Sequence, residues 1–179
     1  YGDRYYPAIS GVARSINYYL INDELAEEGT VSLALGLGKY IVDGGMTLRF
    51  SPYHPNQVLQ TSEMEIALKE TQTRFYALKN LGQNFSLDDG FNLLKLHVKD
   101  AEADGALNFI ASTYDPYDMV IRDGIYPGGR KLITFANILQ HDVFPLARIL
   151  QLAQKYGQGE MRRPVEIEFA VNFDARTKS

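Results

Sequence analysis

The strict alternation of apolar and polar residues at 164–172, PVEIEFAVN, constrains the fold more than any other stretch of the chain. Successive side chains of a β-strand point to opposite faces, so this pattern predicts a strand. Its apolar face consists of Val165, Ile167, Phe169 and Val171. Glu166 and Glu168 then project from the other face, about 6.5–7 Å apart along the strand. Because Mg²⁺ binds carboxylates together with substrate phosphates, the pattern indicates either a magnesium site or a solvated strand face.

The remaining segments predict short strands and helices in no regular order. Strands are expected at residues 8–21, 31–37, 47–50, 93–98, 106–113 and 119–122. Apolar residues spaced three and four apart predict a helix over residues 61–81, which begins with a capping box of Ser62 and Glu65. Residues 131–139 fit either a strand or a helix. Since no βαβ rhythm is present, we expect a single α+β domain covering residues 1–179.

A second helix is expected directly before the last strand. It spans residues 142–156, with Asp142 as its cap, Pro145 in its first turn, and Gly157 and Gly159 after its end. One side of this helix carries Leu146, Ile149, Leu150 and Ala153. The connection to the last strand is short, so we expect the two elements to pack as antiparallel neighbours.

Composition excludes several classes of function. The chain has 179 residues and a net charge of −4, which argues against a broad nucleic-acid surface. It contains no cysteine, so disulfides and thiolate zinc sites are excluded, and we expect a cytoplasmic protein. No apolar run reaches the ~20 residues of a membrane-spanning helix, and no membrane partner is expected. The first residue is Tyr1 rather than Met, so we expect a piece of a longer protein.

A glycine-rich stretch at residues 34–45, ALGLGKYIVDGG, has the composition of a phosphate loop without its spacing. Its glycines either allow a sharp backbone turn or allow the backbone to approach a phosphate. Lys39 either neutralises a phosphate or extends into solvent. Arg14 lies in a predicted strand, so its charge needs an ion-pair partner or a position at the sheet edge.

Three stretches, in this order, resemble the nucleotide-binding domain of the phosphoenolpyruvate synthase and pyruvate phosphate dikinase family. They are SGVA at residues 10–13, GLGKYIVDG at residues 36–44 and VEIEFA at residues 165–170. Family members carry SGV-A/M-F, GLGE-x-VV-x-G and DIE-W/F at these places. The resemblance implies the C-terminal portion of an ATP-grasp domain, with a mainly antiparallel mixed sheet and helices packed on one face.

The same resemblance implies a reaction and a set of ligands. In the family, ATP phosphorylates a histidine on a swivelling domain, and the phosphohistidine then phosphorylates pyruvate. The implied cofactors are ATP and Mg²⁺. We predict that ATP is contacted by Gly36, Gly38, Lys39 and Arg14, and that Mg²⁺ is bound by Glu168 and Glu166. No catalytic residue is expected within this chain.

Several positions depart from the family pattern. Lys39 replaces a glutamate, Glu166 replaces an aspartate, and Arg14 replaces an aromatic or aliphatic residue. The Q-x-R strand of the family is absent. The implied partners are the N-terminal ATP-grasp subdomain with its phosphate-binding lysine and arginine, the swivelling histidine domain and the pyruvate domain. These departures leave open an alternative, a non-catalytic nucleotide-binding or regulatory module that retains the fold.

Overall fold

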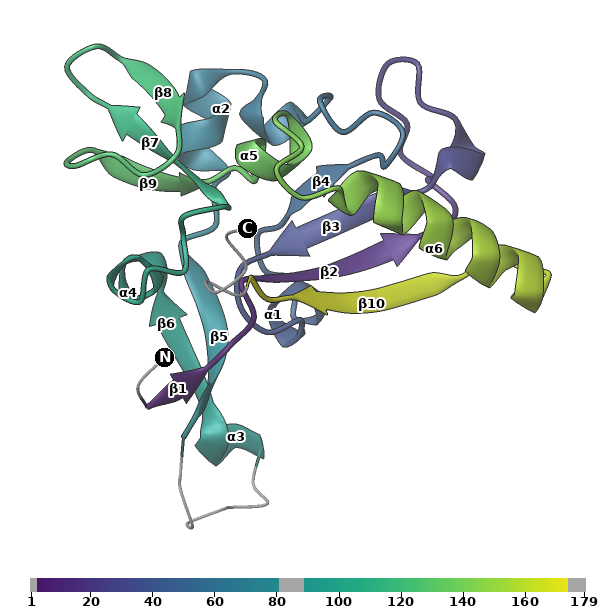
Figure 1. Ribbon diagram of the computed structural model, residues 1–179, viewed down its shortest axis with the longest axis horizontal. Helices are drawn as coiled ribbons and strands as arrows, with labels where there is room; N and C mark the ends of the chain where they lie inside the picture. Colours follow the sequence, from purple (N-terminus) through teal and green to yellow (C-terminus); the bar gives the residue numbers. More distant parts are fainter. Residues whose placement is uncertain (1–2, 81–88, 174–179) are drawn as a thin grey trace.

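The computed structural model describes residues 3–80 and 89–173, whose strands form three small antiparallel sheets (Figure 1). The α+β class is thus confirmed. We had expected one mainly antiparallel mixed sheet, but the described strands form three separate sheets, and every pairing among them is antiparallel.

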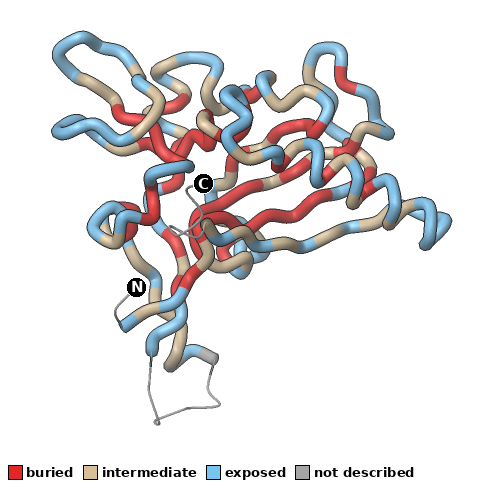
Figure 2. The backbone as a smooth tube through the Cα atoms, viewed as in Figure 1, coloured by how far each residue is buried: buried red, intermediate tan, exposed pale blue. Residues whose placement is uncertain are grey.

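The largest sheet has the strand order β10-β2-β3-β4. Its strands are β10 (Glu166–Val171), β2 (Ile9–Arg14), β3 (Thr30–Ala34) and β4 (Leu48–Phe50). One face is apolar and carries Ile167, Phe169, Ile9, Ala13, Val31, Leu33, Leu48 and Phe50. The other face carries Glu166, Glu168, Ser10, Val12, Arg14, Thr30, Ser32 and Arg49. Figure 2 shows the inner strands buried, whereas the edge strand β10 alternates between exposed and half-buried residues.

The remaining described strands form two three-stranded sheets. One has the order β1-β5-β6, with strands Arg4–Tyr5, Arg74–Lys79 and Leu93–His97. The other has the order β8-β7-β9, with strands Val120–Asp123, Ala111–Asp115 and Arg130–Ile133. Five short helices are α1 (Lys39–Val42), α2 (Met64–Lys69), α3 (Asp89–Asn92), α4 (Val98–Ala103) and α5 (Ala136–Leu139). Two 3₁₀ helices span Ala26–Glu28 and Leu59–Thr61.

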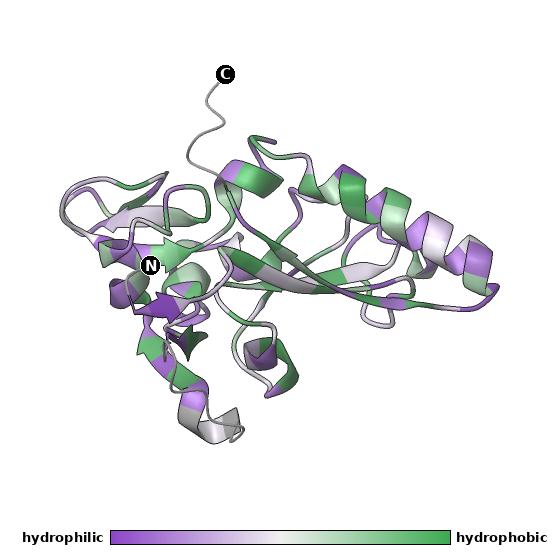
Figure 3. Cartoon of the chain, turned by 60° about the horizontal axis from the view of Figure 1, so that its bottom comes forward, coloured by the Kyte–Doolittle hydropathy of each residue, from purple (hydrophilic) through white to green (hydrophobic). Residues whose placement is uncertain are grey.

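The long helix α6 (Leu146–Met161) covers the apolar face of the largest sheet (Figure 1). Figure 3 shows that its first turns are more hydrophobic than its last ones. Leu146, Leu150 and Gln154 are its buried residues, and the expected stripe is therefore wrong at Ile149, which is 43 % exposed. The predicted packing of this helix beside the last strand is confirmed, because Gly157 lies against Val165.

The predicted ends of α6 were wrong. Asp142 does not cap it, because the helix begins four residues later with Pro145 at the N-cap position. Gly157 and Gly159 lie inside the helix, which continues to Met161 and is ended by Arg162 in a left-handed conformation (φ 52°). A Cβ at Gly157 would lie 3.4 Å from a methyl group of Val165, an ordinary van der Waals distance, so this packing does not require a glycine.

The helix predicted over residues 61–81 was also wrong. Of the described residues in this range, only Met64–Lys69 form an α-helix, which is α2, and β5 begins at Arg74. The segment RFYALK also alternates, and Phe75 and Ala77 are fully buried on one face of the strand. The capping box does not form, because Glu63 occupies the N-cap position without a side-chain hydrogen bond. Cross-strand pairing with β1 and β6 thus prevails over the helical spacing.

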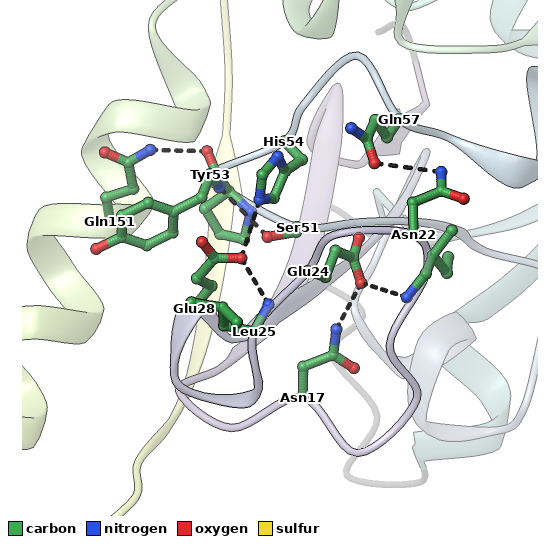
Figure 4. A network of polar contacts seen from close by, with 12 residues as sticks. Asn17, Asn22, Glu24, Leu25, Glu28, Ser51, Tyr53, His54, Gln57 and Gln151 are labelled. Carbon is green, nitrogen blue, oxygen red and sulfur yellow. Dashed lines mark hydrogen bonds and ion pairs between the residues drawn. The ribbon is translucent and has the colours of Figure 1, made fainter.

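The strand predicted over residues 8–21 ends at Arg14, and a loop held by polar contacts follows (Figure 4). The buried carboxylate of Glu24 accepts hydrogen bonds from Asn17 Nδ2 at 2.8 Å and from the backbone N–H of Ile21 at 3.1 Å. His54 Nε2 lies 3.0 Å from Glu28 Oε2 within the same network. These hydrogen bonds satisfy polar groups of the loop without strand pairing.

The other predicted strands have mixed outcomes. The strand predicted at 106–113 begins only at Ala111, and the ambiguous residues 131–139 contain both strand β9 and helix α5. Strands β3, β4, β6 and β8 confirm the remaining predictions to within a few residues. Within the described residues, no helix has the length and apolar character needed to cross a membrane.

Candidate functional site

A pocket of about 610 Å³ lies between the polar face of β2 and β10 and the β1–β5 ribbon. All three stretches that carry the family resemblance contribute to its wall. These residues are Ser10, Gly11 and Val12, then Leu37 and Gly38, then Glu168, Phe169 and Ala170. The rest of the wall comes from Tyr5, Tyr6, Pro7, Leu78 and Asn172. The volume is in the range of small-molecule sites.

The strand register brings two of these stretches together. Glu168 pairs with Val12 and Ala170 pairs with Ser10, so their side chains share the polar face. On the opposite face, the ring of Phe169 lies over Gly11, where a Cβ would come within 2.2 Å of a ring carbon. Because Gly11 has no side chain, the ring of Phe169 on β10 can lie over the neighbouring strand β2.

A sharp turn at Gly36 places the third stretch at the pocket. Gly36 has φ +87°, and a Cβ there would lie 2.6 Å from the carbonyl oxygen of Tyr76. The N–H groups of Gly36 and Leu37 donate to Pro7 O at 3.2 Å and to Tyr76 O at 2.9 Å. Gly36 thus has the structural role that its residue type suggests. Gly38 differs, since it has ordinary helical dihedrals and lines the pocket itself.

The two predicted magnesium ligands lie on the same face in different surroundings. Glu168 is exposed at the pocket wall and forms no hydrogen bond or ion pair with the described residues. Glu166 Oε2 accepts a hydrogen bond from Arg14 Nε at 2.6 Å. Both side chains of this ion pair are about half exposed, at 49 % and 51 %. The exposed partner that Arg14 was expected to need is therefore Glu166, at the end of the strand.

The donor set fits a magnesium ion only in combination with other oxygens. No group of three or more histidine, cysteine, aspartate or glutamate side chains capable of holding a metal occurs within the described ranges. Mg²⁺ commonly uses one or two carboxylates, with substrate phosphates and water completing the octahedron. Glu168 with Glu166 meets that requirement, whereas a metal held by protein ligands alone does not fit here.

Lys39 lies at the start of α1, outside the pocket wall. Its ammonium group is 2.9 Å from Asp43 Oδ1, one helical turn later. The hydrogen bond from Lys39 lowers the pKa of the Asp43 carboxyl. A hydrogen bond to the same carboxyl raises the pKa of Tyr76. Of the four predicted ATP contacts, Gly38 lines the pocket, and Gly36, Lys39 and Arg14 do not.

Charge in the pocket is sparse. Glu168 is its one charged lining residue within the described part of the chain, and no lysine, arginine or histidine lines it. The aromatic and aliphatic wall is suited to a flat apolar group. A triphosphate bound there would need cations from outside this wall.

Sequence reasoning missed the side of the pocket formed by β1 and β5. Tyr5 pairs with Leu78 across these strands. Tyr6 is buried, and its hydroxyl donates to Asp104 Oδ2 at 2.5 Å. The alternation in RFYALK was the available signal, but the helical spacing over residues 61–81 obscured it.

Comparisons of this chain with protein-family models, with curated proteins and with solved structures found no match.

Proposed function

We propose that this chain forms one wall of an ATP site in a phosphotransferase similar to phosphoenolpyruvate synthase. In this proposal the fold is an ATP-grasp-like subdomain. The parent protein uses ATP to phosphorylate a histidine on a swivelling domain, and that histidine then phosphorylates pyruvate. The chain contributes binding residues and no catalytic ones.

One observation supports the proposal above the others. The third resembling stretch follows the first two by more than a hundred residues, yet side chains or backbone from all three line one pocket. Three unrelated matches to family motifs would have no reason to converge on one wall. The apolar wall of this pocket is suited to the nucleobase, and Glu168 supplies a carboxylate beside it.

The proposed roles follow from position. Glu168 and Glu166 hold Mg²⁺ jointly with phosphate oxygens, and the ion neutralises phosphate charge when it is bound. Gly38 allows the ligand to approach the backbone closely, while Gly36 fixes the turn before it. Lys39 and Arg14 are near the phosphate region in this proposal, and each must exchange its carboxylate partner to reach a phosphate. The missing positive charge is assigned to the N-terminal ATP-grasp subdomain.

A second function is favoured by the two ion pairs. Because Arg14 neutralises Glu166 and Lys39 neutralises Asp43, all three residues that depart from the family are already paired within the chain. Such pairing suits a nucleotide-binding or regulatory module without phosphoryl transfer. In this second proposal Glu168 still affects nucleotide affinity, but the parent protein transfers no phosphoryl group to a histidine.

The first test uses the isolated chain and Mg-ATP. We expect a dissociation constant no tighter than about 1 mM, because only part of the nucleotide contacts are present. In ¹⁵N-labelled protein at millimolar Mg-ATP, the amide signals of Ser10, Gly38 and Ala170 should shift most. Shifts confined to other surfaces would contradict the assignment of this pocket.

The second test uses the parent protein. Glu168→Gln retains size and removes the charge, so we expect ATP-dependent phosphorylation to fall about 10²-fold, the scale of a lost electrostatic contact in phosphoryl transfer. Glu166→Gln should cost less, because Arg14 already offsets its charge. Glu160→Gln, an exposed position on α6, is the control. Equal and small effects at Glu166 and Glu168 would show that this strand face is merely solvated.

A further inference from the structure

A second and larger pocket, of about 790 Å³, lies away from the proposed nucleotide pocket and shares no residue with it. It is formed where α2 and the segment after it meet α4, the end of β7 and the start of β9. These elements lie together on the left of Figure 1. Its wall joins two of the small sheets, and the stretches that carry the family resemblance do not contribute to it.

The charge of this second pocket is opposite to that of the whole chain. Lys99, Arg130 and Lys131 line it, against one carboxylate, Glu102, which leaves an excess of two positive charges. The chain as a whole carries a net charge of −4. A local reversal of sign within a concave site concentrates anions there.

Lys131 is the fixed part of this charge. Its side chain is only 6 % exposed. The ammonium group donates to the carbonyl oxygens of Tyr126 at 2.8 Å and Gly128 at 2.7 Å, and it lies 3.5 Å from Glu102 Oε1. Two of the three ammonium donors thus make hydrogen bonds, and Glu102 forms an ion pair with the same group. Lys131 therefore holds the loop before β9 and pairs with the only acidic side chain of the pocket.

The other two cations have no such partners. Within residues 3–80 and 89–173, the side chains of Lys99 and Arg130 form no hydrogen bond or ion pair. His97 adds a further donor, because its Nδ1 accepts the backbone N–H of Lys99 and Nε2 then carries the proton. His97 on β6, Lys99 on α4 and Arg130 on β9 thus bring donors from three separate elements to one cavity.

Apart from the amide of Gln72, the remaining side chains of the wall are apolar or carry hydroxyl groups. Leu68, Val98 and Pro116 supply apolar surface, and Thr73 and Tyr114 supply hydroxyl groups. A pocket with cationic donors beside such surface suits a ligand with an anionic group and a compact apolar body. Guanidinium and ammonium groups bind phosphate oxygens through charge-assisted hydrogen bonds.

We propose that this second pocket binds a small phosphate monoester with a compact apolar or aromatic body, through Arg130 and Lys99. The proposal is independent of the ATP site, because the two pockets share no residue.

The test is calorimetric titration of the chain with phenyl phosphate, inorganic phosphate and benzyl alcohol. We expect saturable binding of phenyl phosphate with a dissociation constant tighter than about 1 mM. Inorganic phosphate should bind more weakly, since it lacks the apolar body, and benzyl alcohol should not bind detectably. Absence of saturable phenyl phosphate binding, or equal affinity for inorganic phosphate, would overturn the proposal.

Variants locate the site. Lys99→Gln with Arg130→Gln should weaken phenyl phosphate binding about tenfold or more, because charge-assisted hydrogen bonds are lost. Arg148→Gln with Arg163→Gln removes the same charge from exposed positions outside this pocket and should leave the affinity unchanged. An equal loss in both double variants would show general attraction to a charged surface and would refute the site. Glu168→Gln should not alter phenyl phosphate binding, which separates this result from the test of the ATP site.

Discussion

Gly36 and Gly38 stand two positions apart and have different roles. Gly36→Ala should lower the free energy of unfolding by about 1–3 kcal/mol, the cost of a side chain in left-handed backbone. The new Cβ would also meet the carbonyl oxygen of Tyr76 at 2.6 Å. Gly38→Ala should change stability by less than about 0.5 kcal/mol, because its nearest contact is Ser10 Cβ at 3.9 Å. Urea denaturation of both variants checks this, and equal losses would contradict the assignment.

The contact between Gly11 and Phe169 predicts a strong coupling. Gly11→Ala places a methyl group within 2.2 Å of the ring, so we expect overpacking to cost about 1–3 kcal/mol. In a Phe169→Ala background the ring is gone, and most of the cost of Gly11→Ala should disappear. A double-mutant cycle in urea measures the difference. An unchanged cost in both backgrounds would mean that the ring does not lie over Gly11.

At the level of elements, the buried side of α6 can be tested against its exposed side. Leu150 is 2 % exposed and Ile149 is 43 % exposed. Leu150→Ala should cost about 2–5 kcal/mol through lost burial and a residual cavity. Ile149→Ala is the matched control and should cost much less, because its side chain is already largely in water. Thermal or urea unfolding of the two variants measures these costs. A larger loss for Ile149→Ala than for Leu150→Ala would contradict the assigned buried side of α6.

The sequence predicts an element correctly where its hydrophobic pattern fits either the strand period or the helical period, but not both. Strand β10 alternates without exception, and its position, its two faces and its neighbour α6 were predicted correctly. Within the range 61–81, the segment RFYALK at 74–79 satisfies both the helical and the strand period, and its pairing with β1 and β6 decides between them. Gly157 predicts a helix end, because a local pattern does not reveal that this residue lies beside Val165.

The candidate site was predictable to a similar extent. The resembling motifs identified Gly38 and Glu168, which line the pocket. They did not identify Tyr5 or Tyr6, because these residues reach the pocket through pairing of β1 with β5, far away in sequence. The Arg14–Glu166 ion pair depends on the register of β2 and β10, which the sequence alone does not specify.

At the scale of the whole molecule, one ion pair joins the N-terminal strand to α4. The carboxylate of Asp104 accepts hydrogen bonds from Arg4 Nε at 2.9 Å, from Arg4 Nη2 at 2.8 Å and from Tyr6. Burial by itself raises the pKa of Asp104, but the bonds from Arg4 and Tyr6 outweigh it and hold this pKa below the ordinary 3.8. A lowered carboxyl pKa stabilises the fold above the ordinary value, and this contribution is lost as the pH falls through the lowered pKa.

Asp104→Asn should therefore reduce the free energy of unfolding by about 1–3 kcal/mol near neutral pH, as expected for hydrogen bonds to a charged group. The difference from the unsubstituted chain should shrink as the pH falls from the ordinary 3.8 through the lowered pKa, below which the carboxyl group is protonated in both the folded and the unfolded state. Urea unfolding across this range provides the measurement, with Glu160→Gln as an exposed control. A difference that does not vary with pH would show that charge has no part in this contact.

The place of β10 in the largest sheet affects how the chain is synthesised and folded. Glu166 lies 152 residues after its partner Arg14. Strand β2 can therefore pair with β10 only after almost the whole described chain has left the ribosome. During that time β2 is an open edge, and Ile9 and Ala13 have no cover from α6 or β10. Closing so long a loop is entropically slow. A nascent chain halted before β10 is therefore the form of this protein most exposed to aggregation and most in need of a chaperone.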